Sequence, residues 1–226
     1  MGLCLLLDSA DPLEWQRWWS TGLFTGITTN PMLLCRAGLP CELPALASLA
    51  AQARSLGVGE LHLQAWGADG TALEACSREL AALAPGLIRV KLPITEAGVR
   101  AAGPLIAAGI PVTFTACYSA AQVLVAAALQ AAYIAPYLGR ITDQGRDGHG
   151  ELLTMQRALR AVGSTTRLLV ASLRCPSDLS QLAAGGCDTF TISPAIAAAL
   201  LENPDTQAAA EQFERAAAAW KCWATS

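Results

Sequence analysis

The chain has 226 residues, of which 53% are hydrophobic and only 15% are charged, and this composition excludes an intrinsically disordered protein. The net charge of −3 comes from 15 basic and 18 acidic residues scattered along the sequence, so we expect no nucleic-acid partner. The mean hydropathy is +0.38, yet no stretch long enough to cross a bilayer is free of polar breaks, so we expect no membrane association.

Short apolar or β-branched runs alternate along the chain with alanine-rich segments of helical period. Eight strands are expected at residues 4–8, 26–30, 60–66, 87–93, 111–118, 133–138, 167–173 and 187–193. Eight helices are expected at residues 11–21, 41–55, 69–83, 96–108, 120–131, 150–162, 177–184 and 194–201, followed by a further helix at 205–220. Asp11, Asp69 and Ser177 are typical N-cap residues at three of these helix starts.

This alternation is typical of an α/β protein, and it predicts a single (β/α)8 TIM-barrel domain over residues 1–226 with an additional C-terminal helix at 205–220. The competing architecture is an open doubly wound sheet, which usually has fewer strands and a glycine-rich phosphate loop. Neither GxGxxG nor GxxxxGK[ST] occurs, and no linker or low-complexity tract divides the chain. A closed barrel places its chemistry at the carboxyl ends of the strands.

Seven of the predicted strands carry a polar or ionisable residue near the carboxyl end. These residues are Asp8, Asn30, Gln64, Lys91, Thr115, Tyr137 and Ser172. One or two polar residues at this level are ordinary for a barrel rim, whereas seven indicate a polar pocket that is lined from all sides.

Lys91 is one of only two lysines, and it lies in the middle of the fourth predicted strand. Burial of an ammonium group is costly and favours the neutral amine, which is a nucleophile near neutral pH. The alternative is a lysine at a sheet edge whose side chain reaches water. The ring of polar partners favours catalysis. Arg89, two residues earlier, either contacts a carboxylate at the bottom of the barrel or further lowers the pKa of Lys91.

The other strand-end residues also have structural interpretations. Asp8 either caps a helix or transfers protons near the lysine. Asn30 precedes a proline, which is typical of a turn, but the run 28–31 holds more hydroxyl and amide groups than a turn requires. Gln64, Thr115 and Tyr137 either satisfy one another or together hold a water molecule that carries protons.

Basic residues follow the sixth and seventh predicted strands. Arg140 and Arg174 come just beyond these strands, and together with Ser172 they suit the binding of a phosphate group. For Arg174 the alternative is a surface salt bridge.

The positions of the cysteines and histidines predict reduced thiols and no metal site. None of the eight cysteines forms a CxxC pair, and several lie in apolar runs. The apolar start at 3–7 has no basic residue before it, so we expect no signal peptide, and reduced thiols in the cytoplasm are predicted. His62 and His149 have no partners at ligand spacing, so we expect no metal site.

Five segments make the chain similar to the transaldolase family. They are Leu-Asp-Ser-Ala at 7–10, Gly-Ile-Thr-Thr-Asn-Pro at 26–31, Val-Lys-Leu-Pro-Ile-Thr at 90–95, Ala-Pro-Tyr-Leu-Gly-Arg-Ile at 135–141 and Ala-Ser-Leu-Arg at 171–174. The similarity runs in order along essentially the whole chain and is strongest to the short branch that contains fructose-6-phosphate aldolases and small transaldolases. Met32, where this family usually has serine, and Arg89 depart from the pattern and bear on the choice of substrate.

The resemblance implies a class I aldol mechanism without metal or cofactor, in which Lys91 forms an iminium with a sugar or sugar phosphate. Asp8 then assists proton transfer, and Asn30, with Thr29 beside it, binds the donor hydroxyls. The phosphate is held by Arg140 and Ser172, with help from Arg174. Family members commonly form rings of five or stacked rings of ten, so we expect a homo-oligomer, either a pentamer or a decamer.

Transaldolases of this family typically carry glutamate on the third strand and phenylalanine on the sixth. Gln64 and Tyr137 resemble the aldolase pattern, in which Gln64, Thr115 and Tyr137 are catalytic because they position the proton-transfer water. We therefore expect an aldolase that cleaves or forms the C3–C4 bond of a ketose phosphate such as fructose 6-phosphate. The alternative is a transaldolase, which passes the dihydroxyacetone unit to an aldose phosphate. A catalytically silent barrel that binds a sugar phosphate is a third hypothesis.

Overall fold

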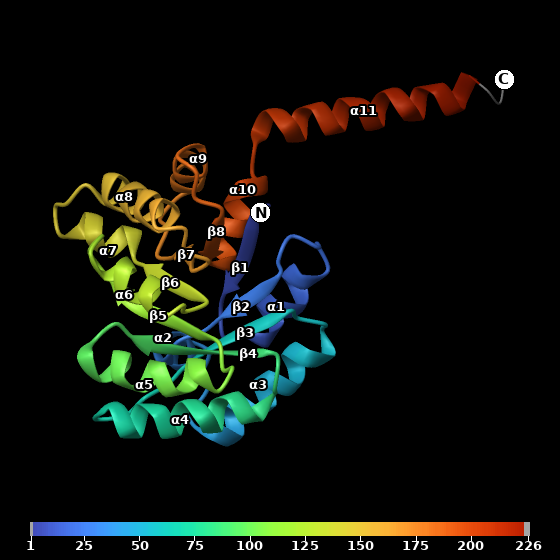
Figure 1. Cartoon of the computed structure of the whole chain (residues 1–226). Coiled ribbons are helices and arrows are strands. Elements are labelled where there is room, and N and C mark those ends of the chain that lie inside the picture. Colours follow the sequence, from blue (N-terminus) through green and yellow to red (C-terminus); the bar gives the residue numbers. More distant parts are fainter. Residues whose placement is uncertain (1, 224–226) are drawn as a thin grey trace.

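The computed structural model describes residues 2–223, with side chains up to residue 220. Eight parallel strands close into a barrel in chain order (Figure 1). The strands are β1 Cys4–Asp8, β2 Gly26–Thr28, β3 Glu60–Gln64, β4 Ile88–Pro93, β5 Val112–Cys117, β6 Tyr133–Pro136, β7 Arg167–Val170 and β8 Thr189–Ile192. Pairing of β8 with β1, for example Phe190 with Leu5, closes the sheet and confirms the predicted TIM barrel.

Helices follow the strands and surround the barrel (Figure 1). They are α1 Pro12–Trp19, α2 Pro31–Arg36, α3 Leu43–Ser55, α4 Gly70–Leu83, α5 Glu96–Ala107, α6 Gln122–Ala128, α7 Leu138–Asp143, α8 Gly148–Ala161, α9 Pro176–Ala184, α10 Pro194–Leu201 and α11 Pro204–Trp223. The short helices α2 and α7 were not expected from the sequence. Both begin within three residues of a strand end, so both lie at the end of the barrel where the predicted site is.

Alternation along each strand separates an outer core from the barrel lumen. In β4, Val90 and Leu92 are fully buried in the main hydrophobic core, whereas Lys91 between them lines a cavity at the end of the barrel. A smaller apolar cluster contains alternate residues of β1 and β6, namely Cys4, Leu6, Tyr133 and Ala135, together with Leu169. The strand pattern therefore turns Lys91 away from the helices and into the lumen.

Two of the three predicted helix caps are confirmed. Asp11 and Asp69 cap α1 and α4, and each accepts a backbone hydrogen bond of 2.9 Å. The prediction for Ser177 is wrong, because α9 begins at Pro176 and its first-turn Asp178 accepts from the backbone nitrogen of Cys175 at 3.2 Å. Proline fits the first helical position, which moves the start of α9 one residue earlier.

The additional helix α11 leaves the barrel after α10 and extends away from it (Figure 1). Two of its large apolar side chains are open to solvent, Phe213 at 72% and Trp220 at 78% exposure. The predicted helix at 205–220 is confirmed, and its described side chains bury almost nothing against the barrel.

No helix among residues 2–223 combines the length and the apolar character that crossing a bilayer requires. Seven cysteines whose side chains the structure describes are free thiols. They are Cys4, Cys35, Cys41, Cys76, Cys117, Cys175 and Cys187. None of these seven is joined in a disulfide, and their reduced state stays a prediction.

Candidate active site

A cavity of about 680 Å³ opens at the carboxyl ends of the strands. It is lined by nine of the ten predicted site residues, namely Asp8, Asn30, Gln64, Lys91, Thr115, Tyr137, Arg140, Ser172 and Arg174. The tenth residue, Thr29, is 1% exposed and does not line the cavity. Closure of the barrel therefore gathers side chains from strands that are far apart in the sequence.

Lys91 combines burial with a specific hydrogen bond. The residue is 6% exposed, and its Nζ donates to the backbone oxygen of Thr29 at 2.6 Å. Burial lowers the pKa of Lys91 from its ordinary value of 10.5, and the negative charge of Asp8 opposes this shift. The lysine thus offers more neutral amine at neutral pH than a solvent-exposed lysine does.

Thr29 supports Lys91 rather than facing the cavity with its own side chain. Both its backbone nitrogen, at 3.0 Å, and its Oγ1, at 3.1 Å, donate to the backbone oxygen of His62 on the neighbouring strand β3. These two bonds hold the Thr29 carbonyl where it accepts from Lys91. The expected contact of the Thr29 side chain with substrate is therefore not what the geometry favours, because the hydroxyl is already used.

Asp8 lies at the end of β1 and is the acidic partner of the lysine. Its Oδ1 accepts a hydrogen bond of 2.7 Å from Thr28, and the Thr28 hydroxyl lies 2.5 Å from that of Thr191. Because Thr28 donates its only hydroxyl proton to Asp8, Thr191 is the donor to Thr28. Burial raises the pKa of Asp8, while Lys91 and the Thr28 bond oppose this shift.

Sequence reasoning did not single out Thr28 or Thr191, although the period of two could have indicated both. Thr28 lies two residues beyond Gly26 on β2, and Thr191 two residues beyond Thr189 on β8. Thr28 and Thr191 are buried at 1% and 4% exposure, and both line the cavity. Residues that share the lumen face of a strand therefore complete the surroundings of Asp8.

Gln64, Thr115 and Tyr137 lie together on the side of the cavity formed by β3, β5 and the end of β6. Gln64 Nε2 donates to the Lys91 backbone oxygen at 3.0 Å, and Thr115 Oγ1 donates to Gln64 Oε1 at 3.3 Å. Burial raises the pKa of Tyr137, and hydrogen bonding with Ala116 and Thr115 opposes this shift. The phenol therefore stays protonated at neutral pH.

A register irregularity in β5 accompanies this trio. Pairing of β5 with β6 shifts between Phe114 and Cys117, and Ala116 within the shift has a φ of 55°, in the left-handed region. A non-glycine residue rarely adopts this conformation, and such bulges re-aim neighbouring side chains. Thr115, which donates to Gln64, lies within this bulge, and pairing with β6 resumes at Cys117.

Asn30 has both of the roles that its sequence context allowed. It is the N-cap of α2, where its Oδ1 accepts from the Leu33 backbone nitrogen at 3.0 Å. The residue also lines the cavity, and with Oδ1 engaged the side chain offers its Nδ2 donor. The Asn-Pro pair thus starts a short helix across the cavity mouth rather than a simple turn.

Arginines dominate the mouth of the cavity. Arg140 lies over the ring of Tyr137 at 5.0 Å and donates to the Tyr118 hydroxyl at 3.5 Å. Arg174 forms the salt bridge that was the alternative to phosphate binding, because its guanidinium pairs with Asp143. Both residues nevertheless line the cavity. Ser172 has a φ of 61°, which is the kind of local strain found at functional sites.

Two further residues at the mouth were not predicted as site residues. Met32 and Arg36 lie one turn apart on α2, and both line the cavity. Met32 Sδ lies 4.0 Å from Nη2 of Arg140. Met32 was noted in the sequence only as a departure from the family pattern, and Arg36 was missed because the helix α2 was not expected.

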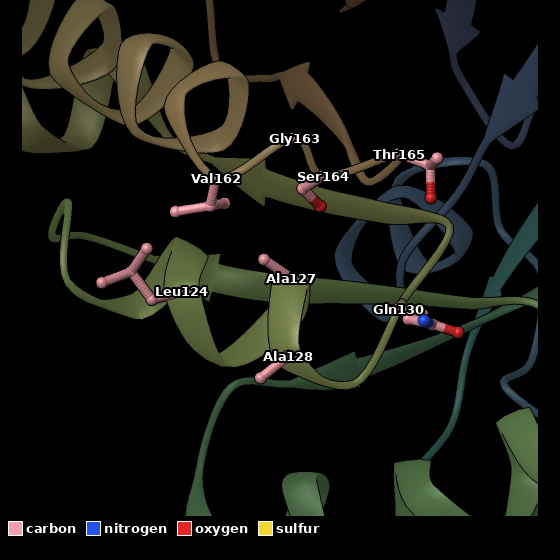
Figure 2. A pocket seen from close by; sticks show the side chains of 8 residues that line it. All are labelled: Leu124, Ala127, Ala128, Gln130, Val162, Gly163, Ser164 and Thr165. Carbon is pink, nitrogen blue, oxygen red and sulfur yellow. The ribbon is translucent and has the colours of Figure 1, made fainter.

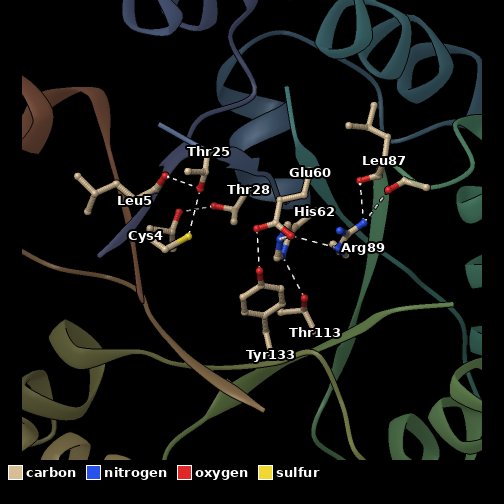
Figure 3. Close-up of polar contacts among 12 residues, drawn as sticks. Cys4, Leu5, Thr25, Thr28, Glu60, His62, Leu87, Arg89, Thr113 and Tyr133 are labelled. Carbon is tan, nitrogen blue, oxygen red and sulfur yellow. Dashed lines mark hydrogen bonds and ion pairs between the residues drawn. The ribbon is translucent and has the colours of Figure 1, made fainter. Parts of the chain in front are cut away.

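The opposite end of the lumen holds a second polar cluster (Figure 3). Glu60 accepts from the hydroxyl of Tyr133 at 2.8 Å and pairs with Arg89 Nε at 3.1 Å. His62 Nδ1 lies 3.0 Å from the Thr113 hydroxyl, and His62 Nε2 is 3.6 Å from Glu60. The first interpretation of Arg89, contact with a carboxylate at the bottom of the barrel, is confirmed.

This bottom cluster opens on a hollow of about 490 Å³, and another hollow of about 440 Å³ lies beside α6 (Figure 2). The hollow beside α6 is lined by short apolar side chains and by Gln130, Ser164 and Thr165, and it contains no titratable side chain. Among the described residues, no three His, Cys, Asp or Glu side chains are arranged to hold a metal ion. The cavity at the strand ends is the one that holds the buried amine of Lys91 together with Asp8 and the arginines of the mouth.

Comparisons of the sequence point to one group of enzymes. The model of the family described as Transaldolase/Fructose-6-phosphate aldolase matches residues 5–225. The chain is similar to a probable transaldolase of Caulobacter sp. (strain K31), with 34% identity over 92% of this chain and 94% of that protein. It is also similar to probable transaldolases of Phenylobacterium zucineum (strain HLK1), at 32% identity over 92% and 94% of the two chains, and of Desulfitobacterium hafniense (strain DSM 10664 / DCB-2), at 33% over 92% and 95%.

Comparisons of the structure support the barrel architecture. The fold is similar to that of thiamine phosphate pyrophosphorylase from Pyrococcus furiosus, with a TM-score of 0.60 and 12% identity over 84% of this chain and 85% of that one. A structure titled Native KDPGal gives a TM-score of 0.59 at 12% identity, over 85% and 82% of the two chains. At this identity the likeness concerns the fold alone.

Proposed function

Because the chain belongs to the transaldolase/fructose-6-phosphate aldolase family, we propose that it is a metal-independent class I aldolase acting on a ketose phosphate such as fructose 6-phosphate. One observation carries this proposal. The amine of Lys91 is buried at the carboxyl ends of the strands, next to Asp8 and inside a cavity with arginines at its mouth. A buried amine of lowered pKa is the nucleophile that Schiff-base chemistry requires.

The reaction begins with attack of the neutral Lys91 amine on the C2 carbonyl of the ketose. The carbinolamine that forms loses water and leaves a protonated iminium, which withdraws electrons from the C3–C4 bond. Asp8 takes the proton of the C4 hydroxyl, and its raised pKa suits a group that accepts and returns protons. Cleavage of the bond then releases an aldehyde phosphate and leaves a dihydroxyacetone enamine on Lys91.

The fate of the enamine decides between an aldolase and a transferase. In an aldolase, a proton reaches C3 of the enamine, and water then hydrolyses the iminium, which frees dihydroxyacetone and the lysine. The amide of Gln64 cannot itself take up or give a proton at neutral pH, so the proton must come from a water molecule. In this proposal Gln64, Thr115 and Tyr137 together hold that water. This trio favours the aldolase.

Substrate is oriented by groups at the mouth of the cavity. Asn30 Nδ2 is the donor available to the hydroxyls of the dihydroxyacetone unit, and Thr29 acts through its carbonyl contact with Lys91. The phosphate is bound by Arg140 and Ser172, and Arg174 joins when its ion pair with Asp143 opens.

The second candidate is a transaldolase, which hands the enamine to an aldose phosphate instead of protonating it. The names of the relatives favour this reaction, since all three cited above are described as probable transaldolases. Both reactions share every step up to the enamine, so the residues that handle Lys91 and Asp8 do not distinguish them.

An assay with fructose 6-phosphate as the only sugar separates the two reactions. The aldolase proposal expects steady release of glyceraldehyde 3-phosphate, detected by a coupled dehydrogenase. Turnover that begins only after erythrose 4-phosphate is added would establish the transferase instead. In the variant Gln64→Glu, which places a proton acceptor on β3, transfer should increase relative to cleavage.

We further propose that the protein works in the cytoplasm as a homo-oligomer, either a pentamer or a decamer. The projecting helix α11 supports an assembly, because its exposed Phe213 and Trp220 need an apolar partner surface. The seven described free cysteines suit a reducing compartment.

A further inference from the structure

The charged side chains that line the active-site cavity do not balance one another. The charge of Asp8 acts on Lys91 in the same cavity, and Arg174 is paired with Asp143. Among the described residues, the two other charged side chains in the cavity are Arg36 and Arg140, and neither takes part in an ion pair. The cavity therefore carries an excess of positive charge, which favours an anionic ligand.

Local structure brings these two arginines to the same part of the mouth. Asn30 caps α2 and Pro31 starts it, so the helix runs directly from the end of β2. Met32 and Arg36 are four residues apart on this helix and share the face that lines the cavity. The Sδ of Met32 lies 4.0 Å from Nη2 of Arg140, so Arg140 reaches the same helical face from α7.

Arg36 is also close enough to the reacting groups to act on them electrostatically. Its charge lowers the pKa of Asp8, although burial remains the larger influence on that carboxyl. Because Arg36 sits in the last turn of a short helix and is exposed, its long side chain has room to turn toward a ligand in the cavity.

We infer that Arg36 is a second anion-binding residue of the cavity, and that with Arg140 it binds the dianionic phosphate of a phosphate monoester substrate. This inference rests on the proposed function and adds to it a residue on α2. Each guanidinium donates charge-assisted hydrogen bonds to phosphate oxygens. Met32 lies one turn before Arg36 on α2, and its Sδ is 4.0 Å from Nη2 of Arg140.

The test compares cleavage of fructose 6-phosphate with cleavage of fructose in the wild-type protein and in Arg36→Gln. The kcat/KM for fructose 6-phosphate divided by the kcat/KM for fructose should fall about tenfold in Arg36→Gln, because one charged donor to the phosphate is lost. Arg36→Lys keeps the charge but not the fork of donors, so it should fall between the wild type and Arg36→Gln. Arg54, an exposed arginine in the last turn of α3, provides the matched control, and Arg54→Gln should leave the ratio unchanged.

Titration of the proteins with inorganic phosphate by isothermal calorimetry provides a readout that needs no turnover. The dissociation constant should rise about tenfold in Arg36→Gln and stay constant in Arg54→Gln. Equal loss of activity toward fructose 6-phosphate and fructose, or unchanged phosphate affinity in Arg36→Gln, overturns the inference. If the wild type cleaves neither sugar, the proposed function fails, and the phosphate titration still decides the role of Arg36.

Discussion

Lys91 and Asp8 shift each other's ionisation in a way that sets the pH dependence of the site. Burial favours the neutral form of both groups, while their opposite charges favour the ionised pair. The Thr28 bond adds to the stabilisation of the Asp8 carboxylate. The amine is therefore kept reactive by burial, and Asp8 limits how far its pKa falls.

Replacement of Asp8 by Asn separates these influences. The variant loses the charge that raises the pKa of Lys91, so the pKa of the lysine should fall further and the neutral amine should persist to lower pH. The midpoint of borohydride trapping against pH should therefore move to lower pH, while turnover falls about a hundredfold because proton transfer is lost. A midpoint that moves to higher pH would contradict the assignment of Asp8 as the partner of Lys91.

Most of the candidate site could be predicted from residues at strand ends, because closure of a parallel barrel brings such residues to one level. Thr29 shows the limit of this rule. Strand β2 ends at Thr28 rather than at Asn30, so alternation stops there and the Thr29 side chain turns to the His62 backbone. The second limit is Arg36, whose position depends on a helix too short to show a period.

Most of the longer helices and strands were predictable, because each contains enough residues for its apolar repeat to be recognised in the sequence. The helix α7 was not, because it starts directly after Pro136 and Tyr137 without a side-chain cap. The helix α2 does carry start signals, in Asn30 and Pro31, which also fit a turn. Strands β1 and β4 end where predicted, whereas the other six end one to three residues earlier, because apolar residues such as Trp66, Leu138 and Leu173 continue the strand pattern beyond the ladder.

Packing of α5 against β4 depends on a glycine at its first turn. A Cβ on Gly98 would lie 1.9 Å from the Pro93 backbone oxygen, so Gly98→Ala forces the helix away from the strand that carries Lys91. We expect a loss of about 3 kcal/mol in the free energy of unfolding, measured by urea titration. Gly103→Ala in the same helix meets no atom within 4 Å and should stay within about 1 kcal/mol of the parent.

Helix α11 is expected to act between subunits. Because its described side chains are nearly all exposed, removal of residues 204–226 should leave the barrel folded but abolish the oligomer. Light scattering after size exclusion measures the mass, and circular dichroism checks the fold. A truncated protein that keeps the mass of the full-length assembly would place the interface elsewhere.

At the scale of the whole molecule, the lumen has two polar ends with different charge balance. At the bottom, Glu60 is bound by Tyr133 and Arg89 and approached by His62. At the top, the cavity keeps positive charge that is not neutralised by neighbouring carboxylates. The bottom end therefore stabilises the barrel, and the top end is left for a ligand.

This division predicts loss of stability in acid. Burial lowers the pKa of His62 below 6.5, so the unfolded chain takes up a proton near that pH that the folded chain does not. The pKa of Glu60 is also lowered, because the hydrogen bond from Tyr133, the nearby His62 ring and the charge of Arg89 together outweigh its burial, and its contribution is lost only below 4.5. Between pH 7 and 5 the free energy of unfolding should therefore fall by up to about 2 kcal/mol through His62.

Urea titrations at both pH values measure this loss. His62→Gln should flatten the dependence. A wild-type stability that is constant from pH 7 to 5 would mean that His62 takes up its proton within the folded barrel.

Reductive trapping of the covalent intermediate tests most directly whether Lys91 is the nucleophile. The protein is incubated with fructose 6-phosphate or dihydroxyacetone, reduced with borohydride, digested and mapped by mass spectrometry. We expect one adduct, on the peptide that contains Lys91, and none in Lys91→Met. An adduct only on Lys221 or the amino terminus, or turnover that survives in Lys91→Met, would contradict this expectation.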